Sequence, residues 1–379
     1  ANYLTAYGWN PAQTWGRDLS QILALQRDIA RAIAHQIRAP LSRDEALRLA
    51  GGRDVNPGAY DAYLRGMFVL HSASTSADFQ RGLSYLNDAI AQDSTEPLPW
   101  AGLALGYDQI GHLSSELPDA FARARAAADR AQRLGGELGE TEAALAQTRL
   151  YYDWDFAGAE QSFRRAIALN SSLPDAHSHY GWLLLLLDRH DEALAALRRA
   201  EEVDPLTPLW PAFTGSAASW IRRPDEALAA TRRSLALNPD FPIGLYVLGG
   251  VLEQQGQADE AIAMQRRAAA GNPGWRFGLG YALARGGHRE EARRLADNLR
   301  RNPTGMNAWG LAEVHAALGE RDEAFRWLEA AYRLRWNWMP WLDFNPAFNT
   351  LRGDPRFEDL LRRIGAPHCL PCPAAPSPG

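Results

Sequence analysis

Lysine is absent from this 379-residue sequence, so all 40 basic residues are arginine. We attribute the absence to a GC-rich genome rather than to function. The 45 acidic residues give a formal net charge of −5, which argues against nucleic-acid binding by this segment. Hydrophobic residues make up 46% of the chain, which is enough to bury a core and is not typical of a disordered protein.

Apolar runs long enough to cross a membrane are also missing. The run Gly181–Leu187 is far shorter than the roughly 20 residues that a membrane-spanning helix needs, so we expect no membrane insertion. A basic, apolar signal sequence is missing as well. The chain starts at Ala1 rather than Met, which is consistent with a processed form or a fragment. The compartment, whether cytoplasmic, periplasmic or extracellular, therefore stays open.

Cysteine is scarce and lies at one end. Cys369 and Cys372 form a CxxC in the tail, which is either a redox pair or half of a zinc site. A metal site needs about two more ligands, and only His368 is near. A thioredoxin-like redox site needs a strand-to-helix setting, which this Pro-rich tail lacks. We favour a flexible tail over residues 367–379.

What the sequence does contain is an internal repeat with a fixed period. Asp-Glu-Ala occurs at Asp191–Ala193, Asp225–Ala227 and Asp259–Ala261, and Asp-Pro or Asn-Pro follows with the same spacing. The pattern returns in Gly319–Ala324. Each unit has the pattern of two helices joined at a glycine such as Gly256, and proline ends the second helix. We expect no strand in the middle of the chain.

The repeat resembles the tetratricopeptide repeat, whose period of about 34 residues it shares. The family positions are occupied here by Leu245, Leu248, Gly249, Leu252, Gly256, Ala261, Gln265, Ala268 and Pro273, and Gln265 departs from the usual aromatic residue. The resemblance implies an all-α, right-handed superhelical solenoid of about eight helix hairpins with helical caps. The predicted units are 57–94, 97–135, 140–171, 174–205, 208–239, 242–273, 274–303 and 305–336, which together form a solenoid over 57–336.

The two ends do not repeat. We expect a strand remnant and capping helices over 1–56 and a C-terminal cap over 337–366, since a repeat array needs atypical ends to cover its last apolar face. Trp336, Trp338, Trp341 and Phe344 are assigned to this cap rather than to a ligand site. Three segments, Arg17–Ala34, Tyr151–Asn170 and Leu351–Gly365, resemble segments of bacterial regulators in which such repeats follow winged-helix, adenylate-cyclase-like or kinase output domains. That resemblance implies a sensory or scaffolding part.

No catalytic or metal motif is evident. HExxH, GxSxG, GxxxxGK[ST] and GxGxxG are all missing. His177 and His179 lie two apart on a helix and point about 200° apart, so they cannot share a metal. We expect His177 in the core and His179 in solvent. The Asp-Glu pairs that begin the second helices favour the helix dipole. We therefore predict no enzyme, no metal and no cofactor.

The concave groove is the candidate binding site that the family resemblance implies. The groove-facing positions of the first helices carry aromatic, leucine and polar residues: Tyr151, Tyr152, Trp182, Leu185, Leu186, Trp220, Tyr246, Glu253, Gln254, Trp309 and Glu313. Tyr and Trp on successive units have the composition of interaction hot spots. The alternative is that the rings only pack against one another. Leu183, Leu184 and Leu187 are assigned to the core.

Arginine pairs recur on the second helices and would form a convex ridge. The pairs are Arg164-Arg165, Arg198-Arg199, Arg232-Arg233, Arg266-Arg267, Arg293-Arg294 and Arg300-Arg301. We favour a solvated face whose charges are offset by nearby acids, over an acidic partner or contacts between copies. The sequence thus predicts a non-catalytic protein-interaction, sensory or scaffold module that binds a peptide or partner segment in the groove. Self-assembly and extracellular glycan binding are the alternatives.

Overall fold

The computed structural model describes residues 56–73, 75–113, 117, 119–135, 137–302 and 304–367. Within these ranges it contains 17 α-helices and no strand, which confirms the predicted all-α class. The elements predicted before residue 56, and the predicted tail beyond residue 367 with Cys369 and Cys372, lie outside the described residues. None of the described helices is both long and apolar enough to cross a membrane.

The helices pair into eight consecutive hairpins, in agreement with the predicted number of units. The pairs are α4 (Pro57–His71) with α5 (Ser76–Gln92), α6 (Pro97–Leu113) with α7 (Ala120–Arg133), α8 (Gly139–Thr148) with α9 (Phe156–Leu169), α10 (Pro174–Leu186) with α11 (His190–Val203), α12 (Leu209–Trp220) with α13 (Pro224–Leu237), α14 (Pro242–Gln254) with α15 (Ala258–Gly271), α16 (Arg276–Arg285) with α17 (Arg289–Leu299), and α18 (Gly305–Ala317) with α19 (Arg321–Arg333). One more α-helix, α20 (Pro355–Ile364), follows the last hairpin. Short turns of other helix types are η2 (Arg149–Asp153), η3 (Pro273–Trp275), η4 (Met339–Trp341) and η5 (Pro346–Phe348).

The helix ends follow from local sequence. Proline occupies the first turn of α10, α13 and α14, where its missing N–H costs nothing. The Thr304 side chain accepts a hydrogen bond from the backbone N–H of Asn307 and caps α18. Acidic pairs lie in the first turn of α11, α13 and α15, where the helix dipole favours them.

The turn between the two helices of a hairpin has one left-handed position that recurs along the chain. Gly256, Gly287 and Gly319 take it with φ of 79°, 85° and 76°. Asp188 and Arg222, the equivalents of Gly256 in the two preceding units, also take it, with φ of 61° and 60°. A non-glycine residue is strained in this region because its Cβ crowds the backbone. The repeat therefore imposes the turn even where glycine is missing.

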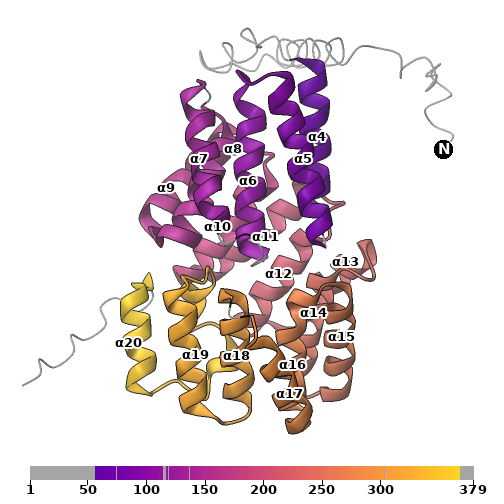
Figure 1. Ribbon diagram of the computed structural model, residues 1–379, viewed down its shortest axis with the longest axis vertical. Helices are drawn as coiled ribbons and strands as arrows, with labels where there is room; N and C mark the ends of the chain where they lie inside the picture. Colours follow the sequence, from indigo (N-terminus) through magenta and orange to yellow (C-terminus); the bar gives the residue numbers. More distant parts are fainter. Residues whose placement is uncertain are drawn as a thin grey trace, which may run out of the picture.

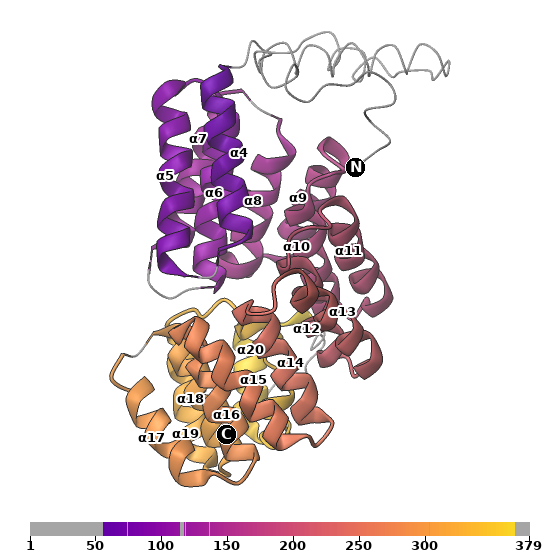
Figure 2. The ribbon, with the colours of Figure 1, turned by 90° about the vertical axis from the view of Figure 1, so that its right-hand side faces the viewer.

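Successive hairpins stack into a right-handed solenoid that turns back on itself (Figures 1 and 2). The helices from α4 to α8 form one end, those from α9 to α13 form the bend, and those from α14 to α19 lie beneath the first group (Figure 2). This curvature brings Arg335 to Tyr152 of η2 and Asn337 to His112 of α6, across 183 and 225 positions of sequence. The concave side is therefore narrow.

The first helices of the hairpins are buried on nearly all sides. In α10, Leu183, Leu184, Leu185 and Leu186 are each at most 2% exposed. Leu187, at the end of this run, is half-buried. Leu183 and Leu184 are thus in the core as predicted. A helix that is apolar all round is stable in water only when neighbouring parts of the protein cover every face. For α10 these neighbours are the adjacent hairpins and residues that lie on the concave side of the solenoid.

Candidate functional site

The concave side of the solenoid holds a stretch of the protein's own chain. We call residues 335–351, which contain η4 and η5, the C-terminal segment. Trp341 Nε1 donates to the carbonyl of Trp182 at 3.1 Å, and Asn337 Nδ2 donates to the carbonyl of His112 at 3.3 Å. Arg335 donates to the carbonyl of Tyr152 at 2.6 Å. These bonds join the segment to α6, η2 and α10, so it lies across the concave face.

Aromatic packing fixes the C-terminal segment in this position. The Trp338 ring lies 4.7 Å from the His112 ring, 4.8 Å from Trp182 and 5.5 Å from Trp220, measured between ring centroids. Trp341 is fully buried and lies 5.5 Å from the Tyr151 ring. Edge-to-face and tilted pairs at such distances each add about 0.5–1.5 kcal/mol beyond area burial. The segment is therefore part of the folded core.

Trp338 and Trp341, which were predicted to cap the end of the array, thus pack against its concave face instead. A segment interrupted by Pro340 and Pro346 cannot continue the stack as a helix, and its tryptophans find apolar cover in the concave face instead. α20 covers the end of the solenoid: Arg363 pairs with Glu329 of α19 at 2.5 Å. Residues 337–366 therefore have two locations, the concave face and the end of the array.

The predicted groove residues come together, but most of them are not open to a partner. Buried residues are Tyr151, Trp182, Leu185, Leu186, Trp309 and Glu313. Partly buried residues are Trp220, Tyr246 and Glu253, whereas Tyr152 and Gln254 are exposed. The expectation of an open aromatic strip is corrected here, because the C-terminal segment and neighbouring hairpins cover it. Trp338, Trp341 and Asn345 occupy the groove, which the repeat register does not predict because these residues belong to a non-repeating segment.

Two small adjoining cavities remain between the groove and the C-terminal segment. The first, the aromatic lobe, has a volume of about 60 Å³ and is lined by Trp182, Trp220, Trp275, Trp309, Trp336 and Trp338 among others. The second, the acceptor lobe, also has about 60 Å³ and is lined by polar residues that include Glu253, Gln265 and Glu313. The two lobes share Ser216, Trp220, Tyr246, Val247 and Asn345.

Two larger clefts open along the outer side of the C-terminal segment. One has a volume of about 550 Å³ and lies between Arg222, Gln254, Arg285 and Asn349. The other has about 390 Å³ and lies between Asp188, Arg222 and other residues up to Arg352. We call them the outer clefts. They are the accessible remainder of the predicted groove.

Glu313 is the most unusual ionisable group at the site. Its Oε1 accepts hydrogen bonds from Trp309 Nε1 at 2.8 Å and from Asn345 Nδ2 at 2.6 Å. Burial raises the pKa of Glu313 to about 7, although these two hydrogen bonds act in the opposite direction. No arginine or histidine forms an ion pair with Glu313 among the residues that the structure describes. A buried carboxylate without a cation is costly, which makes this position a candidate site.

Gln265 brings a second acceptor to the same place. It occupies the repeat position where the family usually has an aromatic residue, and it is 3% exposed. Its Nε2 donates to the carbonyl of Tyr246 at 2.9 Å, whereas its Oε1 has no partner among the described residues. Gly249 and Gly278 make room for the amide, since a Cβ on either would lie 2.5–2.6 Å from it. The departure from the family pattern therefore leaves a buried, unpaired oxygen on a side chain that lines the acceptor lobe.

The predicted histidine assignments hold only in part. His177 is buried as expected, and its Nε2 lies 2.9 Å from the carbonyl of Ser171. His179 is also buried, with Nδ1 2.8 Å from the hydroxyl of Tyr151, so its predicted exposure to solvent is wrong. Rings from three other elements surround it: His112 of α6 at 5.4 Å, Tyr151 of η2 at 5.5 Å and Phe213 of α12 at 6.0 Å between ring centroids. Burial lowers the pKa of His179 to about 4.

Several arginines of these pairs form ion pairs with acids of adjacent hairpins, and others pair with acids of their own helix. Arg233 contacts Glu201 at 2.9 Å, and Arg266 contacts Glu291 at 3.0 Å. This agrees with the interpretation of the ridge as a solvated face whose charges are offset locally. Exposed pairs of this kind each contribute at most about 1 kcal/mol.

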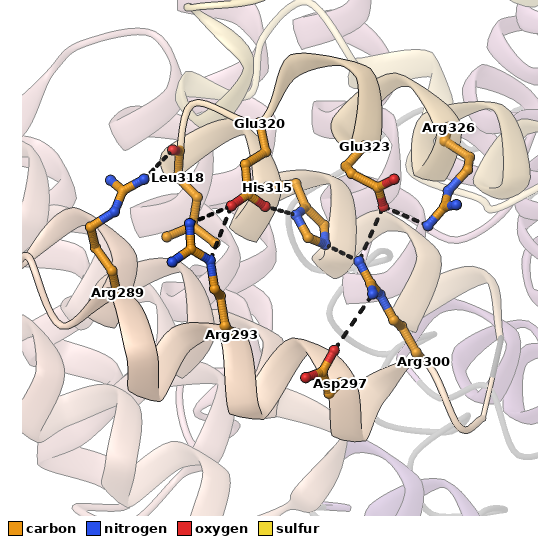
Figure 3. A network of polar contacts seen from close by, with 9 residues as sticks. All are labelled: Arg289, Arg293, Asp297, Arg300, His315, Leu318, Glu320, Glu323 and Arg326. Carbon is orange, nitrogen blue, oxygen red and sulfur yellow. Dashed lines mark hydrogen bonds and ion pairs between the residues drawn. The ribbon is translucent and has the colours of Figure 1, made fainter.

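The last two hairpins carry an extended network of such contacts (Figure 3). His315 lies between Glu320 of the α18–α19 turn, at 2.6 Å from Nδ1, and Arg300 of α17, at 3.0 Å from Nε2. Arg300 also contacts Glu323 at 3.1 Å, and Arg293 contacts Glu320 at 2.7 Å. The network joins α17 to α18 and α19 across the convex surface. Among the described residues no group of three or more His, Cys, Asp or Glu side chains could hold a metal ion.

The comparisons with known proteins identify the family of this architecture. Residues 155–272 match the family model described as tetratricopeptide repeat, so this part of the chain consists of tetratricopeptide repeats. Among solved structures it is similar to yeast Tom70 (15% identity, TM-score 0.46), with 85% of this chain and 66% of that chain covered. It is also similar to pilF of Pseudomonas aeruginosa (19% identity, TM-score 0.39, 64% and 92% covered) and to TTC0263, a tetratricopeptide-repeat protein of Thermus thermophilus (17% identity, TM-score 0.41, 51% and 99% covered). No curated protein matches the sequence.

Proposed function

We propose that this chain is a non-catalytic protein-interaction scaffold that binds a segment of a partner protein in the outer clefts. The tetratricopeptide-repeat fold suggests an interaction or scaffold role. The observation that carries the finer proposal is the position of the clefts. They follow the concave face alongside the C-terminal segment, so a segment of a second protein has a channel next to the protein's own chain.

Arg222 is the residue on which we centre this interaction. It lines both outer clefts, and it forms no ion pair among the residues that the structure describes. The arginines of the convex face, in contrast, are mostly paired with acids. An unpaired guanidinium in a cleft favours a carboxylate on the partner, because arginine binds a carboxylate through two parallel hydrogen bonds. Gln254, at the rim of one cleft, offers a neutral hydrogen-bonding group beside it.

The test is quantitative co-purification of partners with Arg222→Ala and Gln254→Ala variants from the native host. We expect recovery of at least one partner to fall tenfold or more in Arg222→Ala. Arg294→Ala is the matched control, since Arg294 lies on the convex face with a side chain 71% exposed. If every partner is recovered equally with the cleft variants and the control, the outer clefts are not the binding site.

The wider context stays a prediction. The resemblance to C-terminal repeat regions of bacterial regulators supports a sensory or scaffolding role next to an output domain. The full reading frame of the gene tests it, because a DNA-binding, cyclase or kinase domain upstream of Ala1 is the expected finding. Self-association and glycan binding also stay predictions, and the burial of Trp182 and Trp309 leaves those two rings no open face for a sugar.

A further inference from the structure

The two lobes beneath the C-terminal segment differ in chemistry although they adjoin. The aromatic lobe is walled by six tryptophans, which offer ring faces and apolar surface. The acceptor lobe is walled by side chains with oxygen acceptors, among them Gln265 and Glu313. Because Trp220, Tyr246 and Asn345 line both lobes, a single small molecule could extend from one into the other.

The charge balance of the acceptor lobe points to a cationic occupant. Glu253, one of its two carboxylates, is matched by Arg285 at 2.6 Å. Glu313, the other, accepts hydrogen bonds only from the neutral groups of Trp309 and Asn345. The lobe therefore contains one carboxyl group whose negative charge, when the group ionises, no cation of the described residues neutralises. Buried charges in proteins are normally paired, because an isolated ion loses its hydration without compensation.

Independent of that charge, Gln265, which lines the same lobe, carries a buried acceptor that has no partner among the described residues. Its Nε2 is committed to the Tyr246 carbonyl, so Oε1 is the free atom of the amide. The residue is only 3% exposed, so bulk solvent scarcely reaches it. An unpaired oxygen and an unmatched carboxylate in one wall both call for a hydrogen-bond donor.

We propose that the paired lobes form a binding site for a small amphipathic amine. Its ammonium group would donate to Glu313 and Gln265 in the acceptor lobe, and its apolar body would lie among the tryptophans of the aromatic lobe. Ring faces attract a cation through their quadrupole, so Trp220 and Tyr246, at the junction of the lobes, add to the selectivity for positive charge. This proposal does not depend on the partner segment in the outer clefts.

No lysine side chain of this sequence can supply such an ammonium group. The sequence contains no lysine, and Arg285, an arginine beside the lobe, is held by Glu253. The source is either a free amine or the lysine side chain of another protein. Both supply the same chemistry, so the experiment includes a probe for each.

The test is isothermal titration calorimetry on the full chain in amine-free phosphate buffer. The first pair of probes is 2-phenylethylamine and 2-phenylethanol, which have the same shape and differ in charge. The second pair is the methylamides of Nα-acetyl-lysine and of Nα-acetyl-norleucine. We expect an ammonium probe to bind at least tenfold more tightly than its neutral partner. This comparison uses the unaltered protein, so it needs no variant to fold.

Glu313→Gln then tests the assigned carboxylate. Glutamine keeps an oxygen that can accept from Trp309 and Asn345 but removes the charge, so we expect at least tenfold weaker binding of the ammonium probe with little change for the neutral one. Glu290→Gln is the matched control, because its side chain is 92% exposed on α17 and it should bind as the unaltered protein does. Which ammonium probe binds identifies a free amine or a lysine side chain as the source. Equal binding of charged and neutral probes, no binding of either ammonium probe, or full affinity in Glu313→Gln would overturn the proposal.

Discussion

At the scale of single residues, the most informative positions are those that depart from the repeat. Gln265 replaces an aromatic residue and leaves an oxygen unpaired in a cavity wall. Glu313 occupies a groove-facing position that neighbouring hairpins and the C-terminal segment have closed over. Each of these groups lowers the stability of the fold, because buried polar groups normally have hydrogen-bond partners. Such exceptions are where functional sites are expected.

Glu313 gives a prediction for the dependence of stability on pH. Its pKa is about 7 in the folded protein, against an ordinary value of 4.5. The folded state therefore holds this proton more tightly than the unfolded state does. The free energy of unfolding should fall as pH rises from 4.5 through 7. The total loss from this group should be on the order of 3 kcal/mol.

The measurement compares the free energy of unfolding of the unaltered protein and of Glu313→Gln at pH 5 and pH 8. Other groups titrate in the same range, but they contribute equally to both proteins and cancel in the difference. Tyr246 and Tyr281, which face Glu313 from α14 and α16, keep their protons there because burial raises the pKa of both. A difference between the two proteins that does not change from pH 5 to pH 8 would contradict the assignment.

At the scale of the elements, the hairpin turn shows how the repeat constrains the backbone. The left-handed position is occupied by glycine in three successive units and by Arg222 and Asp188 in two others. Packing of the helices on either side fixes the backbone of the turn. A residue other than glycine at this position is therefore held in a strained conformation. Gly256 has open space where a Cβ would lie, and only the backbone conformation disfavours a side chain.

Substitutions at Gly256 and Arg222 should change the free energy of unfolding in opposite directions. Gly256→Ala should lower the free energy of unfolding by about 1 kcal/mol, because alanine in the left-handed region crowds the next carbonyl. Arg222→Gly should raise the free energy of unfolding by about 0.5 kcal/mol. The strain that glycine relieves in the folded state should exceed the free-energy cost of the extra conformational freedom that glycine gives the unfolded chain. Urea midpoints of the two variants, measured beside the unaltered protein, provide the check. Shifts in the same direction for both would show that the turn is not strained.

At the scale of the whole molecule, the C-terminal segment converts an open array into a closed one. Most contacts in a solenoid join neighbouring repeats, so distant hairpins are normally uncoupled. Here Trp338 packs on His112 of α6 and on Trp182 of α10, and Trp341 donates to the Trp182 carbonyl. The segment should therefore couple the stability of the first hairpins to that of the last.

The double variant Trp338→Ala with Trp341→Ala tests this coupling by hydrogen exchange. We expect amide protection in α6 and α10 to fall at least tenfold, although both substitutions lie far from these helices in the sequence. Phe357→Ala is the control: it removes a fully buried ring of α20, which packs on α19 at the end of the array. Loss of protection in α6 and α10 with the control as well would indicate general destabilisation rather than coupling through the segment.

The sequence alone determined the helices, the eight hairpins and the arginine ridge with its local acids. These depend on contacts within a unit or between neighbours, and the fixed period of the repeat reports such contacts directly. The positions of Tyr151, Trp182 and Trp309 on one face followed from the same register.

Only the tertiary structure decided what that face encloses. The winding of eight hairpins brings Trp338 against His112, and no periodic pattern records a contact between one repeating and one non-repeating segment. Small rotations between successive hairpins add up over the array, so the width of the concave side is a property of the whole molecule. That accumulated curvature closed the aromatic strip, buried His179 and left the two lobes and the outer clefts in place of an open groove.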